Sequence, residues 1–227
     1  MKINEILNKL CEEHYGTQPY VADGIFFHSN VDGWEEEENR VLFVLKQPNS
    51  DDLLGEDYRE YDIDTLMTNQ VWQQLLTRLY GIHNTTASYY PSYEEACSDT
   101  LRRETFQRYP LAVININKEQ GAGTTSTAEM NHYAKENLAF ISQQIAILQP
   151  RYVICCGVGV FDIMNAAITP SIESSGNWLK YNPNRDIIFF DTYHPGKPMA
   201  GERLKEAYVM PLKELEIINN NLYNLNY

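Results

Sequence analysis

The sequence has few of the features that mark specialised classes of protein. No apolar run approaches the length of a membrane span and the N-terminus lacks a secretory pattern, so we expect a cytoplasmic protein without membrane partners. Glycine and proline are not in excess and 43% of the residues are hydrophobic, which is typical of a folded chain. A length of 227 residues suits one α/β domain, so we predict a single domain over residues 1–227.

Patterns for metal, phosphate-loop and serine-hydrolase sites are missing. None of Cys11, Cys97, Cys155 and Cys156 belongs to a Cys-x-x-Cys pair, and the five histidines show no ligand spacing. No lysine is followed by Ser or Thr in P-loop spacing, and no Gly-x-Ser-x-Gly elbow occurs. We therefore predict no metal and no cofactor.

Basic residues are scarce. Lys and Arg number 18 against 31 Asp and Glu, which gives a net charge of -13. Because DNA affinity rests largely on contacts between basic side chains and phosphates, duplex DNA is a disfavoured partner. A local cluster of basic residues can still attract an anion, because salt limits the reach of the mean charge to about 8 Å.

Four apolar runs separated by helical patterns predict the fold. Runs without polar alternation are typical of strands buried on both faces of a parallel sheet, and helices are the usual crossovers between such strands. We predict a three-layer α/β/α sandwich with a central four-stranded parallel sheet. The runs are Val41 to Leu45, Leu111 to Ile116, Tyr152 to Cys156 and Ile187 to Phe190.

Apolar residues at helical spacing place the helices. A helix from Ile3 is expected to end before Gly16, and one from Leu66 to stop at Gly81. Further helices are predicted at 94–106, 138–148, 160–168 and 203–218, the last with a kink at Pro211. The segment before the first strand is predicted to be a short hairpin or extension, and 169–185 a loop.

Each apolar run ends in residues suited to binding or chemistry, and ligands collect at the carboxyl ends of parallel strands. Lysines in three exits predict a positive pocket for a small anion, a phosphate-bearing ligand or one nucleotide of a flipped strand, although lysines also favour loops in general. The exit residues are Lys46, Gln47, Pro48 and Asn49; Asn115 and Lys118; Gly157; and Tyr193, His194, Gly196 and Lys197.

His194 is the best placed histidine, because it lies in a strand-exit turn beside Pro195. It is a candidate general acid or hydrogen-bond donor, and the alternative is that it caps backbone groups. The Gly-rich segment 121–126 could cradle a phosphate, and Gly157-Val158-Gly159 is interpreted as a tight strand-to-helix turn.

Taken together, the exits resemble the uracil-DNA glycosylase superfamily, over about Val41 to Pro198. Leu45-Lys46-Gln47-Pro48-Asn49 is similar to the turn after the family's first strand, where Gln47 falls at the water-activating position. Ala112-Val113-Ile114-Asn115 resembles the second strand, which ends in the Asn that reads the base. Tyr193-His194-Pro195-Gly196 looks like the family's His-Pro-Ser turn.

The resemblance implies a sheet order of 2-1-3-4 and hydrolysis of an N-glycosidic bond. It implies that His194 donates to the departing base, Asn115 reads the base, and Gln47 orients water. Backbone near Gly196, with Lys197, would hold a phosphate. The implied ligands are a nucleobase, a nucleotide or single-stranded DNA.

Two residues depart from the family pattern. Gln47 replaces an Asp or Asn, and an amide cannot act as a general base. Leu45 replaces a small residue that lets the backbone approach the ligand. The sequence therefore leaves a second hypothesis open: an inactive member that binds a nucleotide, an anion or a protein partner.

Overall fold

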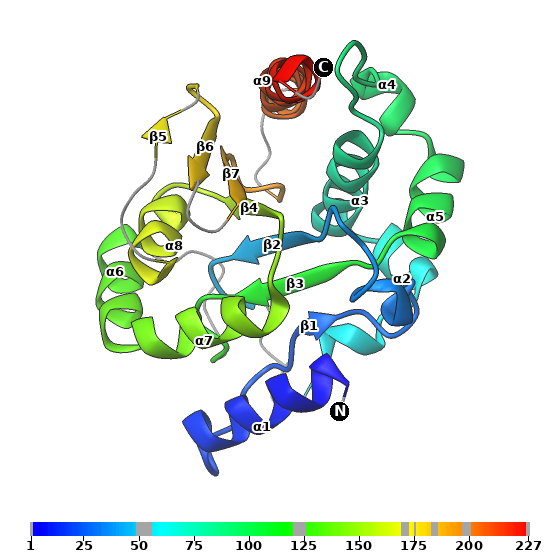
Figure 1. Ribbon diagram of the computed structural model, residues 1–227. Helices are drawn as coiled ribbons and strands as arrows, with labels where there is room; N and C mark the ends of the chain where they lie inside the picture. The colour runs from blue at the N-terminus through cyan, green and yellow to red at the C-terminus, as the bar shows by residue number, and fades with distance from the viewer. Residues whose placement is uncertain are drawn as a thin grey trace.

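The strands of the computed structural model form one sheet with helices packed against both faces (Figure 1). The structure describes residues 2–48, 56–119, 126–168, 173–174, 176–182, 186–196 and 201–225. Within these residues the sheet has seven strands in the order β1-β3-β2-β4-β7-β6-β5. The protein is thus an α/β protein with three layers.

Four parallel strands form the centre of this sheet. β2 (Val41–Leu45) pairs with β3 (Ala112–Asn115) on one side and β4 (Tyr152–Cys156) on the other, and β7 (Ile187–Thr192) pairs with β4. In chain order this is 2-1-3-4, the predicted arrangement. Every residue of β2 and β4 is buried, because helices cover both faces of these strands.

The sheet is wider than the four strands predicted, and it is mixed. β1 (Gly24–Ile25) pairs antiparallel with β3, while β6 (Leu179–Asn182) and β5 (Glu173–Ser174) extend the other edge antiparallel beyond β7. Two of these strands fall in the segment 169–185 that was predicted to be a loop. β6 has no apolar run because it is covered unevenly: Leu179 is fully buried, whereas Lys180 and Tyr181 are partly exposed.

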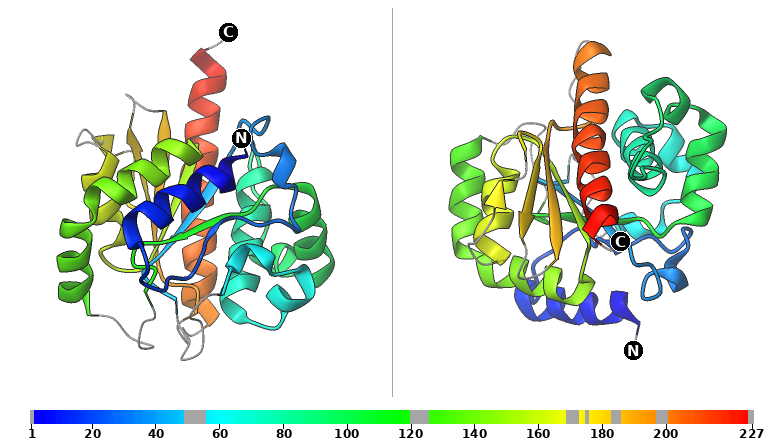
Figure 2. Two further views of the ribbon diagram at one scale, coloured as in Figure 1. Left: turned by 90° about the horizontal axis from the view of Figure 1, so that it is seen from below. Right: turned by 45° about the horizontal axis from the view of Figure 1, so that its top comes forward.

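The helices divide between the two faces (Figures 1 and 2). One face carries α2 (Ile63–Met67), α3 (Gln70–His83), α4 (Tyr93–Ala96), α5 (Asp99–Arg108) and α9 (Gly201–Leu225). The other face carries α1 (Ile3–Tyr15), α6 (Thr127–Glu136), α7 (Leu138–Leu148) and α8 (Val160–Ile168). Short 3₁₀ turns lie at Val31–Gly33 and Tyr58–Glu60. None of the described helices is long and apolar enough to cross a bilayer.

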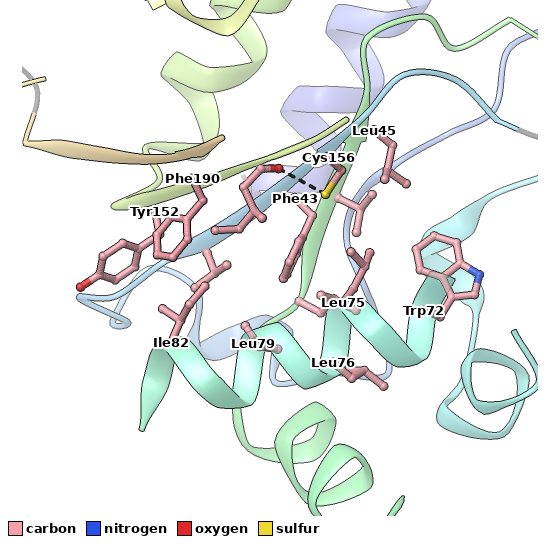
Figure 3. Packing of buried hydrophobic residues seen from close by; sticks show 14 of the residues in the cluster. Phe43, Leu45, Trp72, Leu75, Leu76, Leu79, Ile82, Tyr152, Cys156 and Phe190 are labelled. Atoms are coloured by element: carbon pink, nitrogen blue, oxygen red, sulfur yellow. Dashed lines mark hydrogen bonds between the residues drawn. The ribbon is translucent and has the colours of Figure 1, made fainter. Parts of the chain in front are cut away.

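α3 supplies much of the packing on its face of the sheet. Figure 3 shows its apolar residues directed at side chains from β2, β4 and β7, among them Phe43, Tyr152 and Phe190. Leu75, Leu76 and Leu79 are fully buried there. This packing fixes α3 along the face of the central strands, with Trp72 on the side of Leu45 and Ile82 on the side of Tyr152.

The predicted helix boundary at Gly81 is wrong, because α3 continues to His83 and α2 is separate from it. A Cβ built on Gly81 would lie 2.7 Å from side-chain atoms of both Leu212 and Tyr208 in α9. Glycine therefore lets α3 and α9 approach closely and does not end the helix here. α9 also runs past the predicted end at 218, to Leu225, with Pro211 inside it.

Candidate functional site

Three of the predicted residues meet where β2, β4 and β7 end. A Cβ built on Gly157 would lie 3.5 Å from His194 Cβ and 3.6 Å from Lys46 Cε. Gly157 has a φ of +120°, which side-chain-bearing residues rarely adopt, and its N–H donates to Thr192 O at 2.8 Å. Glycine at this position thus brings Lys46 and His194 to the same turn.

The imidazole of His194 is held by the turn that contains it. The backbone N–H of Gly196 donates to His194 Nδ1 at 3.1 Å. With Nδ1 as the acceptor, a neutral imidazole carries its proton on Nε2, which makes Nε2–H a hydrogen-bond donor. A Cβ on Gly196 would lie 2.5 Å from Val71 Cγ2, so glycine also allows the turn to pack on the first residues of α3.

Arg78 lies beneath this turn, and sequence reasoning missed it. Its Nη2 donates to Tyr193 O at 3.2 Å and its Nη1 to Cys156 Sγ at 3.7 Å, while the residue is 6% exposed. These partners immediately precede His194 and Gly157. The available signal was a charged residue at an apolar position of the helix, between Leu75 and Ile82.

No acid among the described residues balances the charge of Arg78. Burial raises the pKa of the Cys156 thiol to about 11, so the thiol is neutral at physiological pH. In the part of the chain that the structure describes, no carboxylate pairs with Arg78. A guanidinium does not give up its proton in proteins, so a buried positive charge remains under the His194 turn.

Lys118 does not join this group, which corrects the predicted pocket of lysines. Its Nζ lies 2.5 Å from Asp23 Oδ1 and 2.6 Å from Asp23 Oδ2, and both side chains are fully buried. The ammonium also donates to Asn115 O at 3.3 Å. Its charge is therefore neutralised inside the protein, by a residue that lies 95 positions away in the chain.

Asn115 stands between the two groups, opposite Leu45 of β2. Its backbone N–H donates to Asp23 Oδ2 at 2.7 Å, and its Nδ2 approaches the same oxygen at 3.4 Å. Its Oδ1 is buried and accepts no hydrogen bond from the described residues. An unpaired buried acceptor costs about 1–3 kcal/mol, and Asn115 is fully buried, so Oδ1 is an unsatisfied polar atom at the end of β3.

Comparison with known proteins does not assign this geometry to a family. No family model matches the chain, and no curated protein matches it. The site is therefore interpreted from its own residues.

The other predicted residues lie around this edge or outside the described chain. Gln47 is partly exposed and Pro48 is buried, and Lys46 O accepts from Asn117 N–H at 2.9 Å, which continues the β2–β3 pairing past the strands. The ring of Tyr193 packs edge-on against Trp178, with ring centres 5.5 Å apart. The remaining predictions fall on residues outside those described: Asn49, Lys197 and 121–125 of the Gly-rich segment.

The arrangement offers complementary hydrogen-bonding groups at one edge of the sheet. His194 supplies a donor at Nε2, Asn115 supplies an acceptor at Oδ1, and Lys46 brings a positive charge beside Gly157. Nucleobases carry C=O acceptors and N–H donors next to each other on one edge. A planar ligand of that kind matches these groups in chemistry.

Proposed function

We propose that this protein is a divergent relative of the uracil-DNA glycosylase superfamily that binds a nucleobase or nucleotide at the carboxyl ends of β2, β3, β4 and β7. The observation that carries the proposal is the His194 imidazole, which Gly196 holds as an acceptor at Nδ1 and which therefore donates through Nε2. The buried Oδ1 of Asn115 supports it as an acceptor for a base N–H. The 2-1-3-4 order of the parallel strands agrees with it.

The proposed reaction is hydrolysis of an N-glycosidic bond. Water adds to the anomeric carbon of the sugar as the bond to the base nitrogen breaks, and the electron pair of that bond leaves with the base. The proton that the water loses is passed through solvent to the departing base, so the products are the free base and the sugar hemiacetal. In this scheme His194 donates a hydrogen bond to the base oxygen and stabilises the departing charge. Asn115 reads the base edge, and the carbonyl of Gln47 orients the water.

Gln47 favours a second candidate function, which is binding without hydrolysis. Its amide cannot remove a proton from water, and loss of a general base lowers rates by about 10² to 10⁴-fold. A protein with the same pocket and no base catalyst would bind a nucleotide without cleaving it. Both candidate functions use the same residues for binding and differ only in whether a water molecule is activated to cleave the ligand.

A glycosylase assay separates the two candidates. Single-stranded and duplex oligonucleotides that carry uracil or hypoxanthine are incubated with the wild type, Gln47→Asp and His194→Ala. Hydrolysis predicts release of free base that rises in Gln47→Asp and disappears in His194→Ala. Single-stranded substrates are expected to react faster, because the net charge of -13 opposes the denser phosphate charge of a duplex.

Titration with free bases and mononucleotides, followed by NMR, tests binding itself. Saturable shifts in the wild type that weaken in His194→Ala, without base release from any substrate, support the binding function alone. If no base, nucleotide or oligonucleotide binds and no substrate is cleaved even by Gln47→Asp, both candidates are rejected.

A further inference from the structure

We infer that Arg78 is a positioning residue for His194, which it orients from beneath the sheet edge through the carbonyl of Tyr193. This inference rests on the proposed function, in which His194 donates to the ligand. Arg78 belongs to α3 and is remote in sequence from the strand-exit turns, so no motif in those turns includes it. It acts on the site through the backbone.

α3 contacts the His194 turn at two points. Val71, at the start of the helix, lies against Gly196, where even a Cβ would approach Val71 Cγ2 to 2.5 Å. Arg78 lies two helical turns further on and donates to Tyr193 O. The residues on both sides of His194 are therefore fixed by one rigid helix, which the core anchors through Leu75 and Leu79.

The planar fork of arginine is required for the second contact. Nη2 reaches Tyr193 O in the β7 exit while Nη1 reaches Cys156 Sγ at the end of β4, so one side chain links two exits. The N–H of Gly157 joins the same two exits by donating to Thr192 O. A lysine has a single nitrogen and cannot reproduce two divergent donors on a flat frame.

Stability alone does not explain an arginine at this position. A buried charge without a carboxylate is costly, and an apolar side chain of similar volume usually serves a core as well or better. The two hydrogen bonds of Arg78 end on Cys156 and Tyr193. These residues immediately precede Gly157 and His194, which meet Lys46 at the candidate site. We therefore attribute the burial of this charge to its role in orienting that site.

The test compares Arg78→Met with Arg102→Met. Arg102 is a matched control, because it is also 6% exposed but its hydrogen bonds to described residues go to Thr77 and Asp99 and not to residues 193–196. Nitrogen-15 NMR of the ligand-free proteins reports which ring nitrogen of His194 carries the proton. The wild type and Arg102→Met are expected to show the Nε2–H form, and Arg78→Met a mixture of both tautomers.

Ligand affinity gives the second measurement. For a nucleotide that binds the wild type, Arg78→Met is expected to bind about tenfold or more weakly, because small misplacements of a site residue are costly, while Arg102→Met retains wild-type affinity. Arg78→Lys, which keeps the charge without the fork, is expected to show mixed tautomers as well. If Arg78→Met does not fold, Arg78→Lys decides the question.

A wild-type tautomer signature in folded Arg78→Met, or in Arg78→Lys, overturns the inference. The tautomer measurement needs no ligand, so it still decides the role of Arg78 if the wild type binds no nucleotide. In that event only the proposed function fails. If the wild type binds a nucleotide and Arg78→Met binds it equally well with an unchanged His194 signature, only the inference about Arg78 fails.

Discussion

Two buried cations near the carboxyl ends of the central strands have different kinds of partner. Lys118 is fully buried and bonds both carboxylate oxygens of Asp23. Arg78 is almost as buried, yet its partners are a carbonyl oxygen and a neutral thiol. A buried charge that pairs with a carboxylate can serve the fold alone, whereas Arg78 has no carboxylate partner among the described residues, which is one basis for the positioning role inferred above.

This difference in partners also distinguishes the β3 side of the candidate site from the β4 and β7 side. On the β3 side, Asp23, Asn115 and Lys118 form a closed group that joins the segment before β1 to the end of β3. On the β4 and β7 side, the groups around His194 are held by backbone hydrogen bonds and by Arg78. Ligand chemistry is expected on the second side, with Asn115 Oδ1 as the contribution of the first.

The largest expected effect comes from Lys118→Met, which leaves the buried carboxylate of Asp23 without its positively charged partner. We expect the free energy of unfolding to fall by about 3–5 kcal/mol, measured by urea denaturation. The double variant Lys118→Met/Asp23→Asn removes the stranded charge and keeps an acceptor for the N–H of Asn115, so it is expected to recover most of the loss. A single variant as stable as the wild type would contradict a structural role for the pair.

Gly157→Ala tests the conformational constraint on the other side of the edge. The φ of +120° strains any residue with a Cβ. We therefore expect the free energy of unfolding to fall by about 1–3 kcal/mol, measured by thermal denaturation. Gly201→Ala is the control, since a Cβ there meets no atom within 4 Å. Equal stability of the two variants would show that the turn after β4 adapts freely.

His83 extends the comparison of Lys118 and Arg78, because it is a basic residue that is buried in its neutral form. Burial and nearby Arg108 lower its pKa from 6.5 to about 4. The unfolded chain therefore takes up a proton first as the pH falls below 6.5, and this contribution to stability is lost between about pH 6.5 and 4. From pH 7 to 5 the loss is about 2 kcal/mol.

His83→Phe keeps the ring that stacks on Tyr109 and removes the titration. The pH dependence of the unfolding free energy is expected to be shallower in His83→Phe than in the wild type over this range. Parallel curves would show that His83 titrates in the folded protein as it does in the unfolded chain.

The smallest expected change in stability is that of Arg78→Met. No carboxylate in the described chain loses its partner, and the cost of burying the guanidinium disappears together with its two hydrogen bonds. We expect the free energy of unfolding to change by about 1 kcal/mol or less, measured as for Lys118→Met. A loss as large as that of Lys118→Met would remove the contrast between the two cations.

The central strands could be predicted from sequence because their signal is local. Val41–Leu45 and Tyr152–Cys156 are unbroken apolar runs, and the structure has strands with these bounds. β6 was missed because only part of a strand near the sheet edge is covered, so Leu179 is the one aliphatic residue of β6 and is followed by Lys180. Gly81 was misinterpreted because the contact that requires it comes from α9, far along the chain.

The candidate site was predictable only where its residues follow the strands directly. Lys46, Gly157 and His194 do so, and the parallel topology brings them together. The pairing of Lys118 with Asp23 and the reach of Arg78 to Tyr193 O depend on side-chain contacts between distant segments. A sequence shows where each charged residue stands in the chain, but it does not show which charges pair with one another in the folded protein.

The close contact of α3 with α9 has a consequence for biosynthesis. α9 lies on α3 through Leu212 and Tyr208, which occupy the space left by the missing side chain of Gly81. Translation makes α9 after every strand and after α3. On a ribosome, α3 is therefore synthesised long before α9, and the side of α3 at Gly81 lacks this cover until α9 is made.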